Sequence, residues 1–213
     1  MEEALSFSKF QKRVQDKYQK DEKRIVGILF VRYGFGLANE LLDDSFKYLD
    51  INTGKGLDIF LPGYGKYKYS SNDLECDEEL IPLKNNKIGW FFNTEKYVDF
   101  KNEAQRIMNW QYEDEATLIL TDYNNGKVDF SNIICINLER AVKSGSISTA
   151  RSVLERITNI ISNKGVYNAY ALSNCLGKEY GKELILEFVS ENIPMKIGKI
   201  GFKLNPFVTR KKR

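Results

Sequence analysis

Three groups of residues have types and spacings that could carry chemistry, and the first surrounds Arg32. The loop 32–39 holds Gly34 and Gly36 between an apolar run and a helical pattern. A glycine-rich turn at such a place can cradle a phosphate with its backbone N–H groups. Asn39 stands where the Gly-x-Gly-x-x-Gly pattern requires its last glycine. The sequence therefore leaves two interpretations, an anion-binding loop or a tight strand-to-helix turn that points Arg32 into solvent.

The second group is Arg32, Asp58 and Tyr64, which would act together if they met at the ends of adjacent strands. Arg32 would then hold an anionic, nucleotide-like substrate beside the Asp58 carboxylate. Asp58, followed by Lys66 and Lys68, also approximates the acid and lysine set of a metal-dependent nuclease. The Glu-x-Lys pairing of that class is missing, so solvated charge is the alternative. We expect no metal site and no cofactor, and the sequence identifies no catalytic residue.

The third group mixes aromatic and basic residues and suggests nucleic-acid binding. Its members could stack on bases and neutralise phosphates, and they are Lys66, Tyr67, Lys68, Tyr69, Arg210, Lys211, Lys212 and Arg213. Residues 194–213 contain seven basic residues and no acidic residue. Two other interpretations compete: a half-buried edge strand over 64–69, and a solvated basic tail at the end of the chain.

Composition excludes several classes of active site. The chain has 213 residues, a net charge of +3 and no histidine, which removes histidine-based catalytic triads and histidine-bearing zinc sites. Three cysteines, Cys76, Cys135 and Cys175, form no Cys-x-x-Cys pair, so a dithiol redox site is absent. We expect a cytoplasmic protein, because the sequence shows neither a secretory signal nor the ~20 apolar residues of a membrane span.

Apolar periodicity predicts alternating helices and strands that would position these groups. Strands are expected at 25–31, 57–61, 88–92, 117–121 and 132–138, and helices at 4–20, 37–49, 93–108, 147–163 and 178–191. Residues 62–86 are expected to hold little regular structure, and 195–207 to form a short strand-like run before the basic tail. This pattern predicts one α/β domain with a mixed sheet of about five or six strands and helices on its faces.

The same pattern predicts the buried core and the organisation of the chain. The expected core residues are apolar and fall on the inward positions of these elements: Val26, Ile28, Phe30, Ile59, Trp90, Leu118, Ile134, Val153 and Ile157. Residues 1–24 are expected to form an N-terminal helix, 25–193 the α/β core, and 194–213 a basic strand and tail.

Two stretches, YLDINTGKGLDIFLPGYG over 48–65 and WQYEDEATLIL over 110–120, resemble an uncharacterised group of bacterial α/β proteins. The resemblance covers about residues 25–160. It implies a thioredoxin-like sheet and an association with phage-defence or toxin-type loci, and it carries over no catalytic residue.

The sequence therefore predicts a non-catalytic recognition component of a bacterial defence or stress system, with a protein partner and no membrane association. Two alternatives remain open. One is a nucleic-acid-binding protein that uses the Tyr/Lys segment and the basic C-terminus, and the other is an enzyme that acts on an anionic substrate. Co-purification with a stable partner would favour recognition, whereas nucleotide turnover lost in Arg32→Ala and Asp58→Ala would favour an enzyme.

Overall fold

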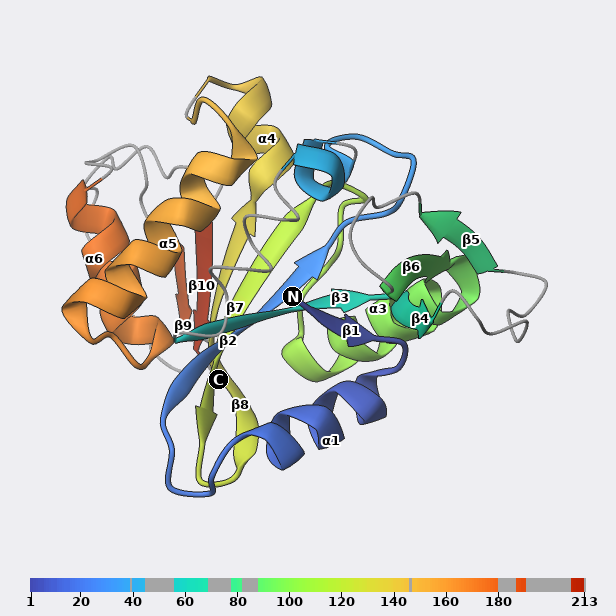
Figure 1. The fold of residues 1–213 in the computed structure, drawn as a ribbon. Helices are drawn as coiled ribbons and strands as arrows, with labels where there is room; N and C mark the ends of the chain where they lie inside the picture. Colours follow the sequence, from blue (N-terminus) through green and yellow to red (C-terminus); the bar gives the residue numbers. More distant parts are fainter. Residues whose placement is uncertain are drawn as a thin grey trace.

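A mixed β-sheet forms the centre of the computed structural model, which describes residues 1–38, 40–44, 56–68, 78–81, 88–145, 147–179, 187–190 and 208–212. The strand order is β1-β3-β2-β7-β8-β10-β9 (Figure 1). The strands are β1 (Glu2–Ala4), β2 (Arg24–Phe30), β3 (Leu57–Pro62), β7 (Thr117–Asn124), β8 (Lys127–Asn137), β9 (Glu187–Ser190) and β10 (Val208–Lys212). Strands β1, β3, β2, β7 and β8 form a continuous mixed sheet, and β10 and β9 extend it to seven strands. The predicted α/β class is confirmed.

Strands β2 and β3 are buried because helices cover both faces of the sheet. They run parallel, with Ile25 opposite Leu57 and Ile28 opposite Phe60, while β7 pairs antiparallel with β2. All six residues of β3 are buried, including the charged Asp58. A nearly continuous apolar run is what a strand covered on both sides requires.

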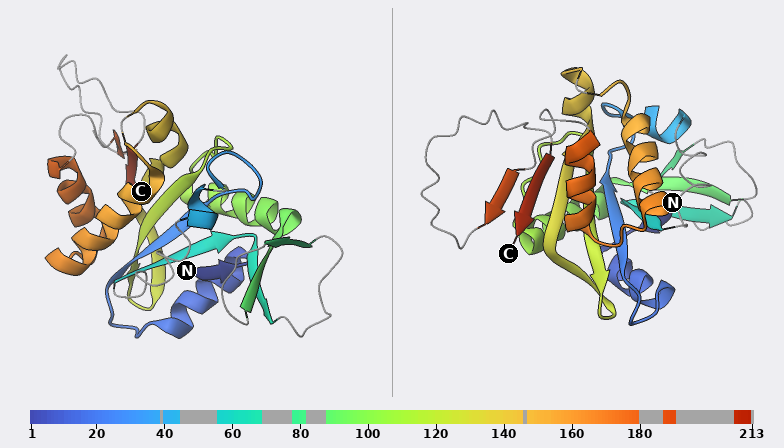
Figure 2. Two further views of the ribbon diagram at one scale, coloured as in Figure 1. Left: turned by 45° about the horizontal axis from the view of Figure 1, so that its top comes forward. Right: turned by 90° about the vertical axis from the view of Figure 1, so that its left-hand side faces the viewer.

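Four longer helices form the two outer layers. Helices α1 (Phe7–Lys17) and α3 (Thr94–Met108) contact each other and β8, and α6 (Ala169–Glu179) contacts α5 (Ala150–Lys164), β7 and β8. Figure 2 shows α5 and α6 together on one side of the sheet, away from α1. Ser6, Asn93 and Thr149 cap α1, α3 and α5 by accepting a backbone N–H, as N-cap residues do.

A smaller antiparallel sheet lies beside the β1 edge of the large one. Its order is β4-β6-β5, with β4 (Tyr64–Lys68), β6 (Ile88–Asn93) and β5 (Glu78–Ile81). The chain passes from β3 to β4 through Gly63, which has φ +78°, and a Cβ there would lie 2.6 Å from the Cβ of Tyr97. Only glycine accommodates both the positive φ and this close packing.

Every predicted core residue is buried. Aromatic rings join the elements: Phe10 of α1 packs edge-on against Phe60 of β3 at 4.9 Å between ring centroids, and Phe7 packs against Phe100 of α3 at 5.2 Å. The periodicity therefore identified the inward face of each of these elements correctly.

The C-terminal part of the chain, from residue 178 onward, departs from the sequence prediction. In place of a helix over 178–191, helix α6 ends at Glu179 and β9 occupies Glu187–Ser190. Residues 208–212 are not a solvated tail, because β10 pairs antiparallel with β8 and parallel with β9. Both differences have one physical reason: a strand gains its hydrogen bonds from partners far away in the sequence, which local periodicity does not reveal.

Three shorter segments also differ. Within the predicted helix 37–49 the structure describes residues 37, 38 and 40–44, of which Glu40–Asp44 form a π-helical turn, and 45–55 lie outside the described residues. Residues 62–86 contain β4 and β5, which form because β6 pairs with both. Strand β8 begins at Lys127, five residues earlier than expected, and the predicted run over 195–207 lies outside the described residues. No helix in the described ranges is long and apolar enough to cross a membrane.

Candidate functional site

The parallel pairing of β2 and β3 separates two of the predicted substrate-binding residues. Asp58 stands opposite Val26, near the amino end of both strands, whereas Arg32 follows the carboxyl end of β2. Six residues of extended chain between positions 26 and 32 correspond to ~20 Å. Asp58 and Arg32 therefore do not meet, and the anionic-substrate site that the sequence suggested is not assembled.

Asp58 is 3% exposed and is fully engaged with neighbouring side chains. Its carboxylate accepts hydrogen bonds from Lys17 Nζ at 2.9 Å and from the Tyr18 hydroxyl, and Arg24 Nη1 lies 4.0 Å away. Burial and the nearby Asp58 charge raise the pKa of Tyr18, so its hydroxyl stays protonated and donates. A buried carboxylate needs such partners, and here they connect α1 and β2 to β3.

The ion pairs continue from Lys17 to the edge strand β1. Lys17 Nζ lies 2.6 Å from Glu2, and Arg13 reaches Glu2 at 3.0 Å and Glu3 at 2.5 Å. Burial alone would raise the pKa of Glu2, but the hydrogen bond and charge of Lys17 outweigh it and lower that pKa. We call Glu2, Lys17, Tyr18, Arg24 and Asp58 the amino-end cluster. It ties the chain's first strand and helix to the sheet.

Arg32 lies in a different environment at the other end of β2. Its guanidinium carbon stands 4.2 Å from the centroid of the Phe35 ring, and Phe35 is 59% exposed. The loop turns through Gly34 and Gly36, both with positive φ. A Cβ on Gly36 would lie 2.5 Å from the Glu139 carboxylate, so Glu139 packs directly against the loop. The sequence-predicted tight turn is present, and it carries an exposed Arg–Phe stack.

A group of aromatic side chains packs at the carboxyl end of β2, where this loop begins. The Phe30 ring lies 5.0 Å from Trp110 and 5.7 Å from Tyr112, and the hydroxyls of Tyr97 and Tyr112 are 2.8 Å apart. Burial is the main cause that raises the pKa of both tyrosines, which keeps this pair neutral. Tyr64 is fully buried and donates its hydroxyl proton to the Val31 carbonyl at 3.0 Å, so it anchors the end of β2.

Charged residues surround the Arg32 loop and the aromatic side chains next to it. They come from the short helix α4 (Leu138–Lys143) and from the segment before β7. Arg140 pairs with Glu113 and with Glu115 at 3.1 Å, and Lys143 lies 2.9 Å from Glu139. Burial would raise the pKa of Glu139, but hydrogen bonds from Lys143 and from a backbone N–H outweigh it, so that pKa is lowered. We call Arg32, Phe35, Trp110, Tyr112 and Glu139 the carboxyl-end surface.

The predicted nucleic-acid residues belong to two distant parts of the molecule. Lys66 lies on β4, where its Nζ donates to the Met1 carbonyl at 3.1 Å and stands 4.7 Å from the Trp90 ring centroid. Tyr67 is half-buried beside it, in the edge strand that the sequence allowed. Residues 210–212 lie on β10, which is separated from β1 by four strands of the large sheet. The two segments do not form one surface.

Several predicted residues lie wholly or partly outside the described part of the chain. Tyr69 and Arg213 lie outside the described residues, and the structure gives only the backbone of Lys68, Arg210, Lys211 and Lys212. No group of three or more metal-ligating side chains occurs within the described ranges.

Sequence reasoning missed Trp110 and Tyr112 as members of a site. Both follow α3 directly, after Asn109, which has φ +47°. Asparagine at a left-handed C-cap, followed by two large aromatic residues, was the available signal.

Comparison with protein-family models, with curated proteins and with solved structures finds no match for this chain.

Proposed function

We propose that the protein is a recognition component that binds a protein partner through the carboxyl-end surface. The observation that carries this proposal is the exposed stack of Arg32 on Phe35, held on a turn at the end of a buried strand. Arginine and aromatic residues dominate the energetically important centres of protein interfaces. An aromatic side chain that is 59% exposed on a supported turn is suited to this role.

The supporting residues keep the stack in a defined position before binding. Glu139 packs against Gly36, and the Trp110 and Tyr112 rings lie 5.6 Å apart against the end of β2. A surface that is already ordered loses less conformational entropy when a partner binds. The charged rim of Glu113 and Arg140 offers polar contacts around the aromatic centre, which is the usual arrangement of such interfaces.

The carboxylate that would serve an enzyme is committed elsewhere. Asp58 is occupied by Lys17 and Tyr18 at the opposite end of the strands, and the Tyr64 hydroxyl is bonded to Val31. These contacts favour binding over the alternative of an enzyme. The proposal that this partner belongs to a bacterial defence or stress system rests on the resemblance of residues 48–65 and 110–120 to bacterial α/β proteins.

Affinity purification of the tagged protein from its native host tests this proposal. We expect a partner to co-purify with the wild-type protein, and Arg32→Ala/Phe35→Ala to weaken binding of the purified partner by tenfold or more in calorimetry, as loss of about 1.4 kcal/mol or more would do. Tyr167→Ala/Tyr170→Ala is the matched control, because these rings are 58% and 52% exposed at the start of α6. Equal binding by the wild type and the Arg32/Phe35 variant would overturn the proposal.

A further inference from the structure

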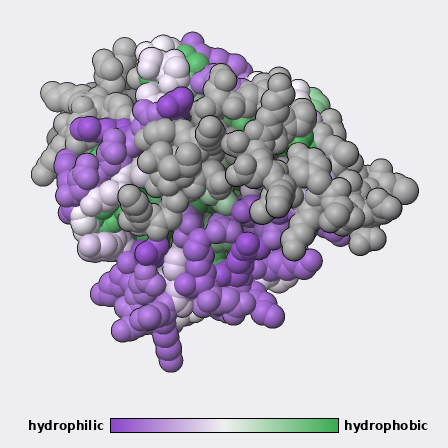
Figure 3. Space-filling model, in the orientation of Figure 1, coloured by the Kyte–Doolittle hydropathy of each residue, from purple (hydrophilic) through white to green (hydrophobic). Residues whose placement is uncertain are grey.

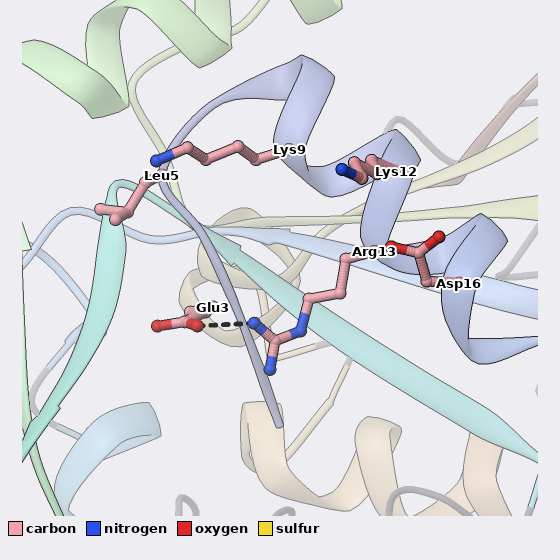
Figure 4. A pocket seen from close by; sticks show the side chains of 6 residues that line it. All are labelled: Glu3, Leu5, Lys9, Lys12, Arg13 and Asp16. Atoms are coloured by element: carbon pink, nitrogen blue, oxygen red, sulfur yellow. Dashed lines mark hydrogen bonds and ion pairs between the residues drawn. The ribbon is translucent and has the colours of Figure 1, made fainter.

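A hollow on the surface of α1 is lined by charged side chains that neither the fold nor the proposed function uses fully. It has a volume of about 330 Å³, and its lining comprises Glu3, Leu5, Lys9, Lys12, Arg13 and Asp16. Figure 4 shows Lys9 extending toward Leu5 and Arg13 reaching across to Glu3. The hollow shares no residue with the carboxyl-end surface, so the two sites are independent.

Two acidic residues, Glu3 and Asp16, line the hollow, and internal contacts neutralise the charge of Glu3. The Glu3 carboxylate accepts from Arg13 Nη1 at 2.5 Å and from the backbone N–H of Lys66 at 2.7 Å. Arg13 also pairs with Glu2 at 3.0 Å. A guanidinium has five N–H donors, so Arg13 retains donors for a further acceptor while Glu2 and Glu3 hold it in place.

The two lysines lack such partners. Lys9 and Lys12 are exposed on successive turns of α1, and neither forms an ion pair with any residue in the described ranges. Asp16 lies four residues after Lys12 and is likewise exposed and without an ion pair there. With Glu3 and Arg13 paired, the lining leaves two ammonium groups against one carboxylate, which favours an anion.

We propose that this hollow binds a phosphate group, with Lys9 and Lys12 as its cations and Arg13 as an oriented hydrogen-bond donor. A phosphate offers several acceptor oxygens around one centre, so it can contact three donors from neighbouring turns at once. A free phosphorylated molecule and the backbone of a nucleic acid present this same group. Figure 3 shows hydrophilic residues over the lower part of the molecule, where Figure 1 places α1.

The anchoring of α1 argues against a membrane as the source of the phosphate. Its apolar residues Phe7, Phe10 and Val14 are buried in the core, so the helix has no apolar face left to insert between lipids. We therefore place the phosphate of a soluble molecule or a nucleic acid at the outer face of the helix.

Calorimetry with inorganic pyrophosphate and fluorescence anisotropy with a short, labelled, mixed-sequence single-stranded DNA test the proposal at low salt. Saturable binding of pyrophosphate supports a small phosphorylated ligand, and binding of DNA alone supports a nucleic-acid backbone. Lys9→Ala and Lys12→Ala should each weaken binding about two- to fivefold, the range for an exposed charge pair. Asp16→Asn should strengthen binding by a similar factor because it removes the opposing charge.

Lys164→Ala is the matched control, since Lys164 is exposed at the end of α5, outside the hollow. It should leave both affinities unchanged, and thermal unfolding should give the same midpoint for the lysine variants and the wild type. In the DNA arm, each lost lysine should also reduce the salt dependence of binding by about 0.7 in the log–log slope. Absence of binding to both probes, or equal losses in Lys9→Ala and Lys164→Ala, would overturn the proposal.

Discussion

The two ends of the β2–β3 pair use similar residue types for different purposes. At the amino end, Asp58 is buried and bonded to Lys17 and Tyr18, which come from the first helix. At the carboxyl end, Arg32 and Phe35 stack on each other on an exposed turn. Charge and aromatic character therefore do not separate a structural residue from a binding residue. The partners that the fold supplies make this distinction.

The largest expected effect is at the amino end. Asp58→Ala should lower the free energy of unfolding by about 3 kcal/mol, because it leaves the Tyr18 hydroxyl and the Lys17 ammonium without their buried acceptor. Urea unfolding measures this change. Asp99→Ala, an exposed acid on α3, should stay within about 0.5 kcal/mol of the wild type. Equal midpoints for the two variants would show that the amino-end cluster does not stabilise the fold.

Tyr64→Phe tests the buried contact beneath the carboxyl-end surface. Loss of the hydroxyl that donates to the Val31 carbonyl should destabilise the protein by about 1 kcal/mol, the usual value for one buried hydrogen bond. Tyr167→Phe is the control, because its ring is largely exposed and water can take over the hydrogen bonds lost with its hydroxyl. If both variants unfold at the same denaturant concentration, the bond to Val31 does not anchor the end of β2.

The pH dependence of stability should report the amino-end cluster with a smaller change. The pKa of Glu2 lies below its ordinary value of 4.5 in the folded protein, so its stabilising contribution is present above that pH and is lost as the pH falls through the folded pKa. Glu2→Gln should therefore reduce the loss of stability between neutral pH and pH ~3 in thermal unfolding. A pH profile identical to that of the wild type would contradict this role for Glu2.

The smallest effect on stability is expected at the exposed stack. Phe35→Ala removes a ring in contact with solvent and one exposed cation–π contact, so the free energy of unfolding should change by about 0.5 kcal/mol or less. Differential scanning calorimetry checks this expectation. A loss as large as that of Asp58→Ala would mean that Phe35 belongs to the structural part of the molecule, and the contrast between the two ends would disappear.

Local patterns predicted the elements that are amphipathic or apolar along their length. Ile157 of α5 and Ile28 of β2 were expected in the core and are fully buried, because a helical or strand period directly reports which face avoids water. The prediction failed for β10 and for the helix expected over 178–191. Strand β10 owes its state to pairing with β8, more than 70 residues earlier in the chain, and β9 owes its state to pairing with β10.

For the candidate site, the sequence indicated Arg32 and its glycine turn, and it also brought Asp58 and Tyr64 into the same hypothesis. Nothing in the spacing of these three residues shows that the parallel register places Asp58 beside Val26. Nor does the spacing show that the segment after α3 would bring Trp110 and Tyr112 under the end of β2. Both facts depend on which elements neighbour each other in the folded chain.

The sequence by itself determined the α/β class, the inward face of the main helices and strands, and the exclusion of histidine chemistry. The apolar residues of each helix or strand recur with the period of that element because they are buried on one face. These features can therefore be predicted from each segment alone. The tertiary structure alone decided that Asp58 is a structural anion, that Arg32 stacks on an exposed ring, and that Lys9 and Lys12 flank a hollow. The chemical role of a charged group depends on its solvation and on its nearest partners, and long-range packing sets both.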